Sequence, residues 1–185
     1  MTTQEQGGSV AHDADEMAPF DLTGPLPAGA TTTVLEASAG TGKTYALAGL
    51  VTRYLAEGHA TLDEMLLITF GRAASQELRE RVRDQLVVAA AALADTIAGR
   101  DRPDLDALVS HLCDAPPEEL RERHDRLRDA LAGFDAATIA TTHQFCQIVL
   151  RSLGVAGDTD ERARLVEDLD DLVAEVVDDL YLARY

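Results

Sequence analysis

A glycine-containing run between a predicted strand and a predicted helix constrains the fold of this chain more than any other feature. It consists of Ala37, Ser38, Ala39, Gly40, Thr41, Gly42, Lys43 and Thr44. Residues 31–35 before it, Thr-Thr-Thr-Val-Leu, are β-branched and apolar and predict a short buried strand. Apolar residues then recur at helical spacing from Leu47 to Leu55, until Gly58 ends the predicted helix. A strand, a glycine-rich loop and a helix in this order form half of a βαβ unit, which predicts a parallel α/β sheet.

The residue types of 37–44 indicate a phosphate-binding loop. They fit the pattern G-x-x-x-x-G-K-[ST] except at Ala37, which replaces the first glycine and therefore needs a negative φ. Small residues let successive backbone N–H groups turn inward around a β-phosphate, and the following helix adds the positive end of its dipole. Lys43 would reach the β- and γ-phosphates, and the Thr44 hydroxyl would bind Mg²⁺. The predicted ligands are ATP, or GTP, and Mg²⁺.

Lys43 is also singled out by composition. The chain has 16 basic residues, and Lys43 is the only lysine among them. A compact ammonium on a flexible stem enters a small phosphate loop where a planar guanidinium fits poorly. The one lysine therefore stands where a lysine is hardest to replace.

Two further strands are predicted, at residues 65–70 and 137–141. The near-continuous apolarity of residues 65–70 is typical of a parallel sheet covered on both faces, and residues 137–141 predict a further short strand. Helices should follow them, at about residues 72–93 and from Thr142, as the capping residue, through Leu153. The predicted fold class is α/β, a parallel sheet of the P-loop NTPase type with flanking helices.

The rest of the chain divides into three predicted segments. Residues 1–30 contain Gly-Gly and three prolines and predict a flexible leader, with order beginning near Thr31. Residues 99–133 are mostly charged helix broken by prolines and resemble a helical insertion. Residues 154–185 predict one acidic amphipathic helix at the C-terminus.

The net charge of −17 argues at first sight against nucleic acid as a partner. Most of the excess acid, however, lies at the two ends of the chain, and four arginines cluster in the middle, as either a phosphate-facing patch or a solvated helix face: Arg72, Arg79, Arg81 and Arg83. No apolar run is long enough to cross a membrane, and no secretory signal is recognised. The two cysteines read as reduced thiols, which predicts a cytoplasmic protein.

Two segments at predicted strand ends carry a resemblance to a known family. Open α/β sheets bind their ligands at the carboxyl ends of strands, where residues 69–74 read Thr-Phe-Gly-Arg-Ala-Ala and residues 141–146 read Thr-Thr-His-Gln-Phe-Cys. These resemble motif Ia (T-F-T-x-A-A) and motif Ib (T-x-H-x-F-C) of superfamily 1 helicases of the UvrD/Rep type. With the leader Pro19-Phe20-Asp21 and the loop at residues 35–44, the chain is most similar to the RecB branch, the helicase–nuclease subunits of exodeoxyribonuclease V.

The resemblance implies a RecA-like motor domain over residues 31–153, incomplete here, with residues 154–185 as the candidate start of subdomain 1B. It implies an ATP-dependent DNA helicase of recombinational repair, acting on duplex ends and single-stranded DNA with RecC- and RecD-like subunits. By position, the DNA contacts are Thr69, Phe70, Arg72, Thr141, His143 and Phe145. A core position for Phe145 and a structural role for His143 stay open as alternatives.

Several departures from the family limit what the resemblance implies. Gly71 stands where motif Ia usually has threonine, and no glutamine precedes the first strand at the place where UvrD-type motors read adenine. No apolar strand ending in Asp-Glu, the Walker B motif, is recognised, and a second motor domain is missing. The chain alone is therefore expected not to hydrolyse ATP efficiently. Two alternative hypotheses are a small P-loop kinase and an inactive nucleotide-gated binding protein.

Overall fold

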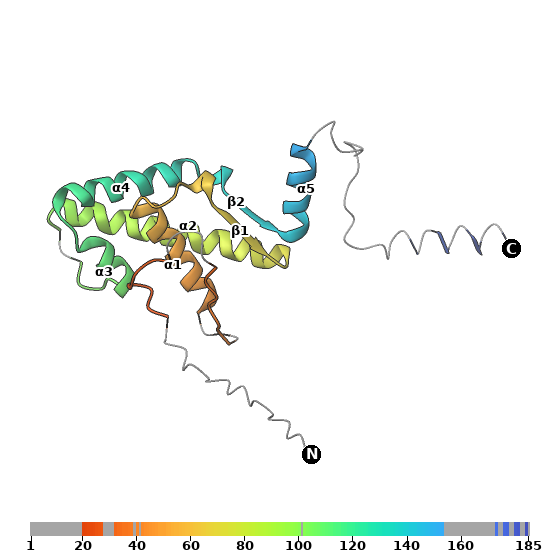
Figure 1. The fold of residues 1–185 in the computed structure, drawn as a ribbon, viewed down its shortest axis with the longest axis horizontal. Coiled ribbons are helices and arrows are strands. Elements are labelled where there is room, and N and C mark those ends of the chain that lie inside the picture. Colours follow the sequence, from red (N-terminus) through yellow and green to blue (C-terminus); the bar gives the residue numbers. More distant parts are fainter. Residues whose placement is uncertain are drawn as a thin grey trace, which may run out of the picture.

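The computed structural model describes residues 20–27, 32–38, 40, 42–100 and 102–153, with a few single positions beyond them. These residues form an α/β structure with a small two-stranded sheet and five helices (Figure 1). The elements in chain order are α1 Lys43–Ala56, β1 Leu66–Thr69, α2 Arg72–Ile97, α3 Ala107–Cys113, α4 Pro117–Ala132, β2 Thr138–Thr141 and α5 Thr142–Ser152. Single 3₁₀ turns lie at Leu62–Glu64 and Phe134–Ala136. None of the helices in the described ranges is long and apolar enough to cross a membrane.

The two strands are parallel and pair in register, with Leu66 opposite Thr138 and Thr69 opposite Thr141. Both were predicted from the sequence, and both predictions are confirmed. The predicted burial on both faces is wrong for β1. Leu67 packs against the core, whereas Leu66 and Ile68 point to the other side of the strand and are exposed, because none of the described elements covers that side.

The strand predicted at residues 31–35 is not present in its described part. Residues 32–35 adopt no regular structure and are exposed, with Val34 at 80%. A strand requires a neighbour for its backbone N–H and C=O groups, and β1 and β2 pair only with each other among the described residues. Apolar and β-branched composition therefore did not suffice to form a strand here.

The hydrophobic core lies between α1, α2 and α4, which pack against one another. Helix α2 presents buried residues three and four positions apart to this core: Leu78, Val82, Leu86, Ala89 and Leu93. Helices α3 and α4 lie within the range predicted as an insertion, and they contribute Leu112, Leu120 and Leu127 to the same core. The long α2 and α4 run side by side in Figure 1.

Residues 20–27 fall within the predicted flexible leader but instead form a turn that packs on α1. Arg53 of α1 donates from Nη1 to the carbonyl oxygens of Leu22, at 2.8 Å, and Gly24, at 2.6 Å. The hydroxyl of Tyr54 donates to the carbonyl oxygen of Pro27. Order along the chain therefore begins before Thr31, because α1 supplies partners for the backbone of this segment.

Helix α5 begins at its predicted place, but its cap is Thr141 rather than Thr142. Thr141 is still extended, and its hydroxyl accepts a hydrogen bond from the backbone N–H of Gln144. The side chain of Gln144 accepts from the N–H of Thr141 in return, which completes a capping box. Thr142 already has helical conformation. The helix predicted within residues 154–185 lies almost wholly outside the described residues.

Candidate functional site

The described part of the loop before α1 contains two glycines in a conformation that other residues rarely adopt. Gly40 and Gly42 have φ values of 77° and 85°, in the left-handed region that favours glycine. A Cβ at either position would meet no atom within 4 Å, so backbone conformation rather than crowding calls for glycine. Among the described residues only glycines have positive φ, so Ala37 has the negative φ on which its replacement of glycine depends. Ala39 and Thr41 lie outside the described residues.

The side chain of Lys43 reaches across this loop. Its Nζ donates to the carbonyl oxygens of Ala37, at 2.7 Å, and Ser38, at 2.8 Å. Lys43 is exposed, so its ammonium is held at the loop by hydrogen bonds rather than by burial. The only cation of this loop therefore already lies beside the backbone that would surround a phosphate.

The start of α1 favours an anion. Gly42 is its N-cap and offers no side chain to the first backbone N–H groups, and the first turn contains no acidic residue. The first N–H groups of a helix have no partner within the helix, and its dipole places partial positive charge there. Together with Lys43, the chemistry of this end of α1 fits the phosphates of a nucleotide.

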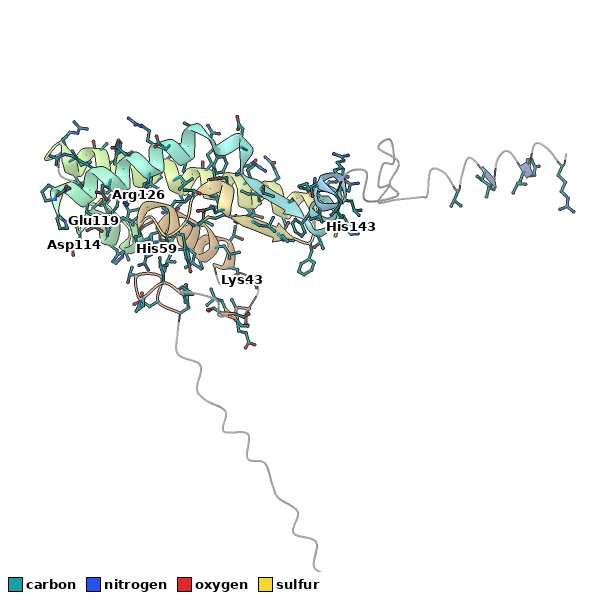
Figure 2. All side chains as sticks on the ribbon, turned by 45° about the horizontal axis from the view of Figure 1, so that its top comes forward. Lys43, His59, Asp114, Glu119, Arg126 and His143 are labelled. Atoms are coloured by element: carbon teal, nitrogen blue, oxygen red, sulfur yellow. The ribbon has the colours of Figure 1, made fainter. Side chains whose placement is uncertain are left out.

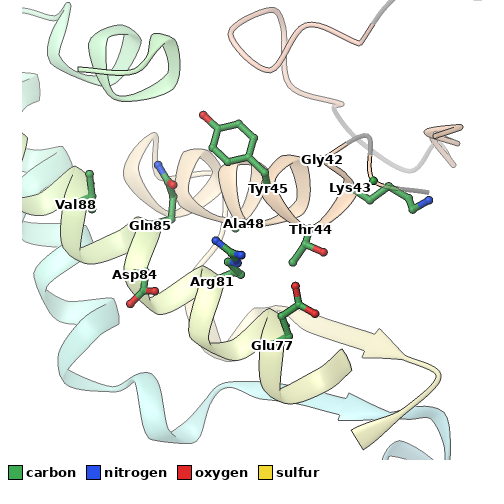
Figure 3. A pocket seen from close by; sticks show the side chains of 11 residues that line it. Gly42, Lys43, Thr44, Tyr45, Ala48, Glu77, Arg81, Asp84, Gln85 and Val88 are labelled. Atoms are coloured by element: carbon green, nitrogen blue, oxygen red, sulfur yellow. The ribbon is translucent and has the colours of Figure 1, made fainter. Parts of the chain in front are cut away.

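Thr44 faces a cleft of roughly 550 Å³ between α1 and α2. In Figure 3 its side chain points toward Glu77 and Arg81 of α2, whereas Lys43 points the other way, toward the loop. A hydroxyl and a carboxylate in one cleft supply the oxygen ligands that Mg²⁺ prefers. The residues present therefore fit a nucleotide phosphate together with its metal ion.

The α2 side of this cleft was predicted only in part, since Arg81 was a candidate phosphate contact but Glu77 and Gln85 were not. Glu77, Arg81 and Gln85 all line it, and they lie four residues apart on one helix face. That spacing was visible in the sequence, but only the packing of α1 on α2 shows that this face meets the loop.

The predicted arginine patch is not a single surface. Arg79 donates from Nη2 to the carbonyl oxygens of Ala137 and Ile139, at 3.1 and 3.3 Å, and so fastens β2 to α2. The guanidinium of Arg83 lies 5.8 Å from the ring centroid of Phe134. Arg81 alone of these three lines the cleft next to Thr44. Arg79 and Arg83 lie four residues apart on one side of α2, whereas Arg81 projects from another side, so these three arginines do not form one phosphate-facing patch.

The two segments predicted to contact DNA, residues 69–74 and 141–146, begin at the same edge of the sheet. Because Thr69 is paired with Thr141, the carboxyl ends of β1 and β2 lie at the same level. Phe70, directly after β1, is 100% exposed, and His143, in the first turn of α5, is also exposed. In Figure 2, His143 lies at the α5 end of the molecule, well apart from Lys43 at the start of α1. The edge thus presents an aromatic ring and an imidazole to solvent.

The two threonines at this edge hold the backbone in place. The hydroxyl of Thr69 lies 2.5 Å from that of Ser75 and donates to the carbonyl oxygen of Gly71 at 3.2 Å. Thr141 is 2% exposed and serves as the cap of α5, so its side chain is not available at the surface. Arg72 is exposed at the start of α2, and Phe145 is half-buried in α5.

A family model covers most of the chain. The chain belongs to the UvrD/REP helicase N-terminal domain family, whose model matches residues 24–183.

Within that family it is similar to RecB. It is 69% identical over 169 residues to the RecBCD enzyme subunit RecB of Mycolicibacterium smegmatis, which covers 91% of this chain and 15% of that protein. It is 64% identical over 166 residues to RecB of Mycobacterium tuberculosis, covering 90% and 15%. RecB of Chlamydia trachomatis is 31% identical over 135 residues, covering 72% and 13%. The predicted resemblance to the RecB branch is confirmed, and the chain spans about 15% of the length of its first two relatives.

Proposed function

We propose that this chain is the ATP-binding N-terminal portion of a DNA helicase–nuclease subunit that acts in recombinational DNA repair. The observation that carries the proposal is the loop itself. Two glycines with positive φ precede an uncapped helix, and the one lysine of the chain is folded across the loop. The membership of the UvrD/REP family supports assigning this loop to a DNA motor.

At the nucleotide site, the loop residues 37–42 hold the phosphates through backbone N–H groups. Lys43 exchanges its bonds to the carbonyl oxygens of Ala37 and Ser38 for bonds to the β- and γ-phosphates. Thr44 contributes its hydroxyl to Mg²⁺ from the cleft between α1 and α2. When bound, Mg²⁺ neutralises phosphate charge, and the task of this chain is to bind and orient the triphosphate.

At the DNA site, single-stranded DNA lies along the edge formed by the ends of β1 and β2. Phe70 offers a fully exposed aromatic face on which a base can stack. Arg72 and His143 contact the phosphate backbone, and the half-buried Phe145 of α5 is a further contact carried over from the family. Thr69 and Thr141 support the edge from within, through their hydrogen bonds to Gly71 and Gln144.

We further propose that nucleotide binding by these residues does not lead to efficient hydrolysis without further parts of a motor. Hydrolysis in this class requires a Walker B carboxylate pair and arginines from a second motor domain. RecC- and RecD-like subunits, and DNA ends as the substrate, are proposed from the similarity to RecB subunits. The cytoplasmic location stays a prediction from the sequence.

The two alternative functions can be distinguished from the helicase proposal. A small P-loop kinase has no use for an exposed phenylalanine and histidine at the strand ends, and the family match over residues 24–183 disfavours it. An inactive nucleotide-gated binding protein would bind nucleotide without any response to DNA. Measuring ATPase activity with and without single-stranded DNA, on these 185 residues and on a version with the length of the relatives, distinguishes them. The helicase proposal requires DNA stimulation in the longer version.

The binding proposals are tested by titration calorimetry on the 185-residue chain. Lys43→Ala should weaken Mg–ATP affinity by roughly 10- to 100-fold, because charge-assisted hydrogen bonds contribute about 1.5–3 kcal/mol. Arg128→Ala, which removes an exposed cation of α4, should leave the affinity unchanged. Phe70→Ala should weaken binding of single-stranded oligonucleotides, whereas Ile97→Ala, at the far end of α2, should not. Unchanged Mg–ATP affinity in folded Lys43→Ala would remove the basis of the proposal.

A further inference from the structure

Helix α5 carries an apolar stripe that no other described part of the chain covers. The stripe consists of Cys146, Val149, Leu150 and the C-cap residue Leu153, which follow one another at the spacing of one helix face. All four side chains are exposed, and none of the residues of α5 is buried. In Figure 1, α5 stands apart from α1, α3 and α4, beyond the two strands. Amphipathic helices are stabilised chiefly by packing of their apolar face, so this stripe calls for a partner.

A second uncovered stripe with the same spacing lies near the C-terminus. Val173, Val176, Val177 and Leu180 are helical, and all four are exposed. They are apolar positions of the acidic amphipathic helix that the sequence predicts within residues 154–185. Exposed apolar residues are ordinary when they are scattered singly, but a continuous apolar surface marks a place where something binds.

We propose that the two stripes cover each other, with residues 173–180 docked on α5 as the second helix of an antiparallel helix pair. Four apolar side chains from each helix then leave water together. The stripe of α5 begins in its second turn, at Cys146, so the docked helix leaves His143 of the first turn at the edge proposed for DNA.

The charges of the two helices favour this pairing. Residues 142–153 contain no acidic residue and include Arg151. Residues 165–182 contain no basic residue, and their acidic residues are Glu167, Asp168, Asp170, Asp171, Glu175, Asp178 and Asp179. Two copies of the acidic helix would repel each other, whereas α5 offers it an apolar surface without negative charge.

The connection between the stripes permits a contact within one chain. Residues 154–172 join them, and Gly154 and Gly157 allow the chain to reverse its direction soon after α5. The stripe of α5 extends only about 11 Å along the helix, at roughly 1.5 Å per residue. The joining residues can span that distance, and a segment tethered so closely has an effective concentration of about millimolar at α5.

The thiol of Cys146 is a direct probe of this contact, because it lies in the stripe of α5 and is exposed while the stripe is uncovered. The 185-residue chain is treated with iodoacetamide, and mass spectrometry of its peptides gives the rate at Cys146 separately from that at Cys113. Val176→Asp should raise the rate at Cys146 by roughly tenfold or more. It places a carboxylate in the stripe, and the loss of one buried apolar side chain changes a population ratio by at least about this factor.

Leu182→Asp is the matched control. It introduces the same carboxylate, but residue 182 is four and seven positions from Asp178 and Glu175 and so shares the acidic face of the predicted helix. The rate at Cys146 should therefore stay that of the unsubstituted chain. Circular dichroism confirms that each variant is folded, and if Val176→Asp is not, the milder Val176→Ser/Val177→Ser must show the same acceleration.

Equal rates in the unsubstituted chain and in Val176→Asp would overturn the proposal. Fast reaction in both would mean that α5 stays uncovered, and slow reaction in both would mean that another part of the chain covers it. Protection of Cys146 that increases with protein concentration, together with a dimer in size-exclusion chromatography, would assign the stripe to a second copy and would overturn the contact within one chain.

Discussion

Arg53 contributes to the stability of the fold and also holds residues 20–27 on α1. Arg53→Met tests both contributions. Methionine retains the apolar stem of the side chain and removes the guanidinium. In the native chain the guanidinium is almost fully buried and makes bonds in two directions, to the carbonyl oxygens of Leu22 and Gly24 and to Glu57, whose Oε1 lies 2.6 Å from Nε. The substitution should therefore release the leader and leave a carboxylate without its principal partner.

The expected size of the stability loss follows from the burial of this ion pair. Removing one member of a buried ion pair costs about 3–5 kcal/mol, because the other charge stays buried. The lower end applies here, since the Nε2 atom of His111 lies 3.6 Å from Glu57 and the leader carbonyls can regain water. A loss of about 3 kcal/mol should lower the melting temperature of a chain of this size by about 10 °C.

Differential scanning calorimetry measures this loss of stability, and two further variants serve as comparisons. Arg53→Met/Glu57→Gln should recover part of the stability, because the second change removes the unpaired charge. Arg128→Met, whose guanidinium is exposed and lies 3.9 Å from Asp125, should change stability by less than about 0.5 kcal/mol. If Arg53→Met resembles Arg128→Met, or if the double variant is no more stable than the single one, the reasoning from burial is refuted.

Three further predictions concern stability. Thr141→Ala should lower the free energy of urea unfolding by about 1 kcal/mol, because the cap of α5 is lost. Thr141→Ser should retain most of this stability, and an equal loss in both variants would contradict the capping role. Gly58→Ala should lower the free energy of unfolding by at least about 1–2 kcal/mol, because φ is 75° and a Cβ would lie 2.9 Å from Arg126 Cζ. Gly99→Ala is the matched control: its φ is 69° but the space around it is open, so it should show only the cost of the backbone conformation. Burial favours a raised pKa for Glu57, but its bonds to Arg53, with the charges of His111 and Arg123, hold that pKa below the ordinary 4.5. The stability from Glu57 should thus be complete above pH 4.5 and disappear as the pH falls through the lowered pKa, so thermal melts of wild type and Glu57→Gln should converge in acid.

The helices could be predicted from sequence because their signals are local. The apolar spacing of α2 was recognised through Leu93, and the structure continues the helix to Ile97. The phosphate loop at residues 37–44 could be predicted because the types and spacing of its residues indicate this chemistry, and it stays a prediction. The error at α5 is a single position, since Thr141 and Thr142 are both capable of capping and only backbone conformation separates them.

What the sequence did not predict depends on contacts between distant residues. Residues 32–35 have the composition of a strand, but a strand is defined by its neighbour, and none of the described strands lies beside them. The bonds of Arg53 to the leader join residues 29 and 31 positions apart. The hydrogen bond from the Tyr45 hydroxyl to Asp106 likewise joins residues 61 positions apart. Such pairings leave no periodic pattern in the sequence.

The central claim is that the loop before α1 holds a nucleotide triphosphate through its backbone and Lys43. Backbone amide NMR during titration with Mg–ATP tests it most directly, because every N–H that should meet a phosphate has its own resonance. The account predicts that the largest shifts occur at Gly40, Gly42, Lys43 and Thr44. Resonances at the loop that stay in place at saturating Mg–ATP, or shifts confined to other parts of the chain, would contradict it.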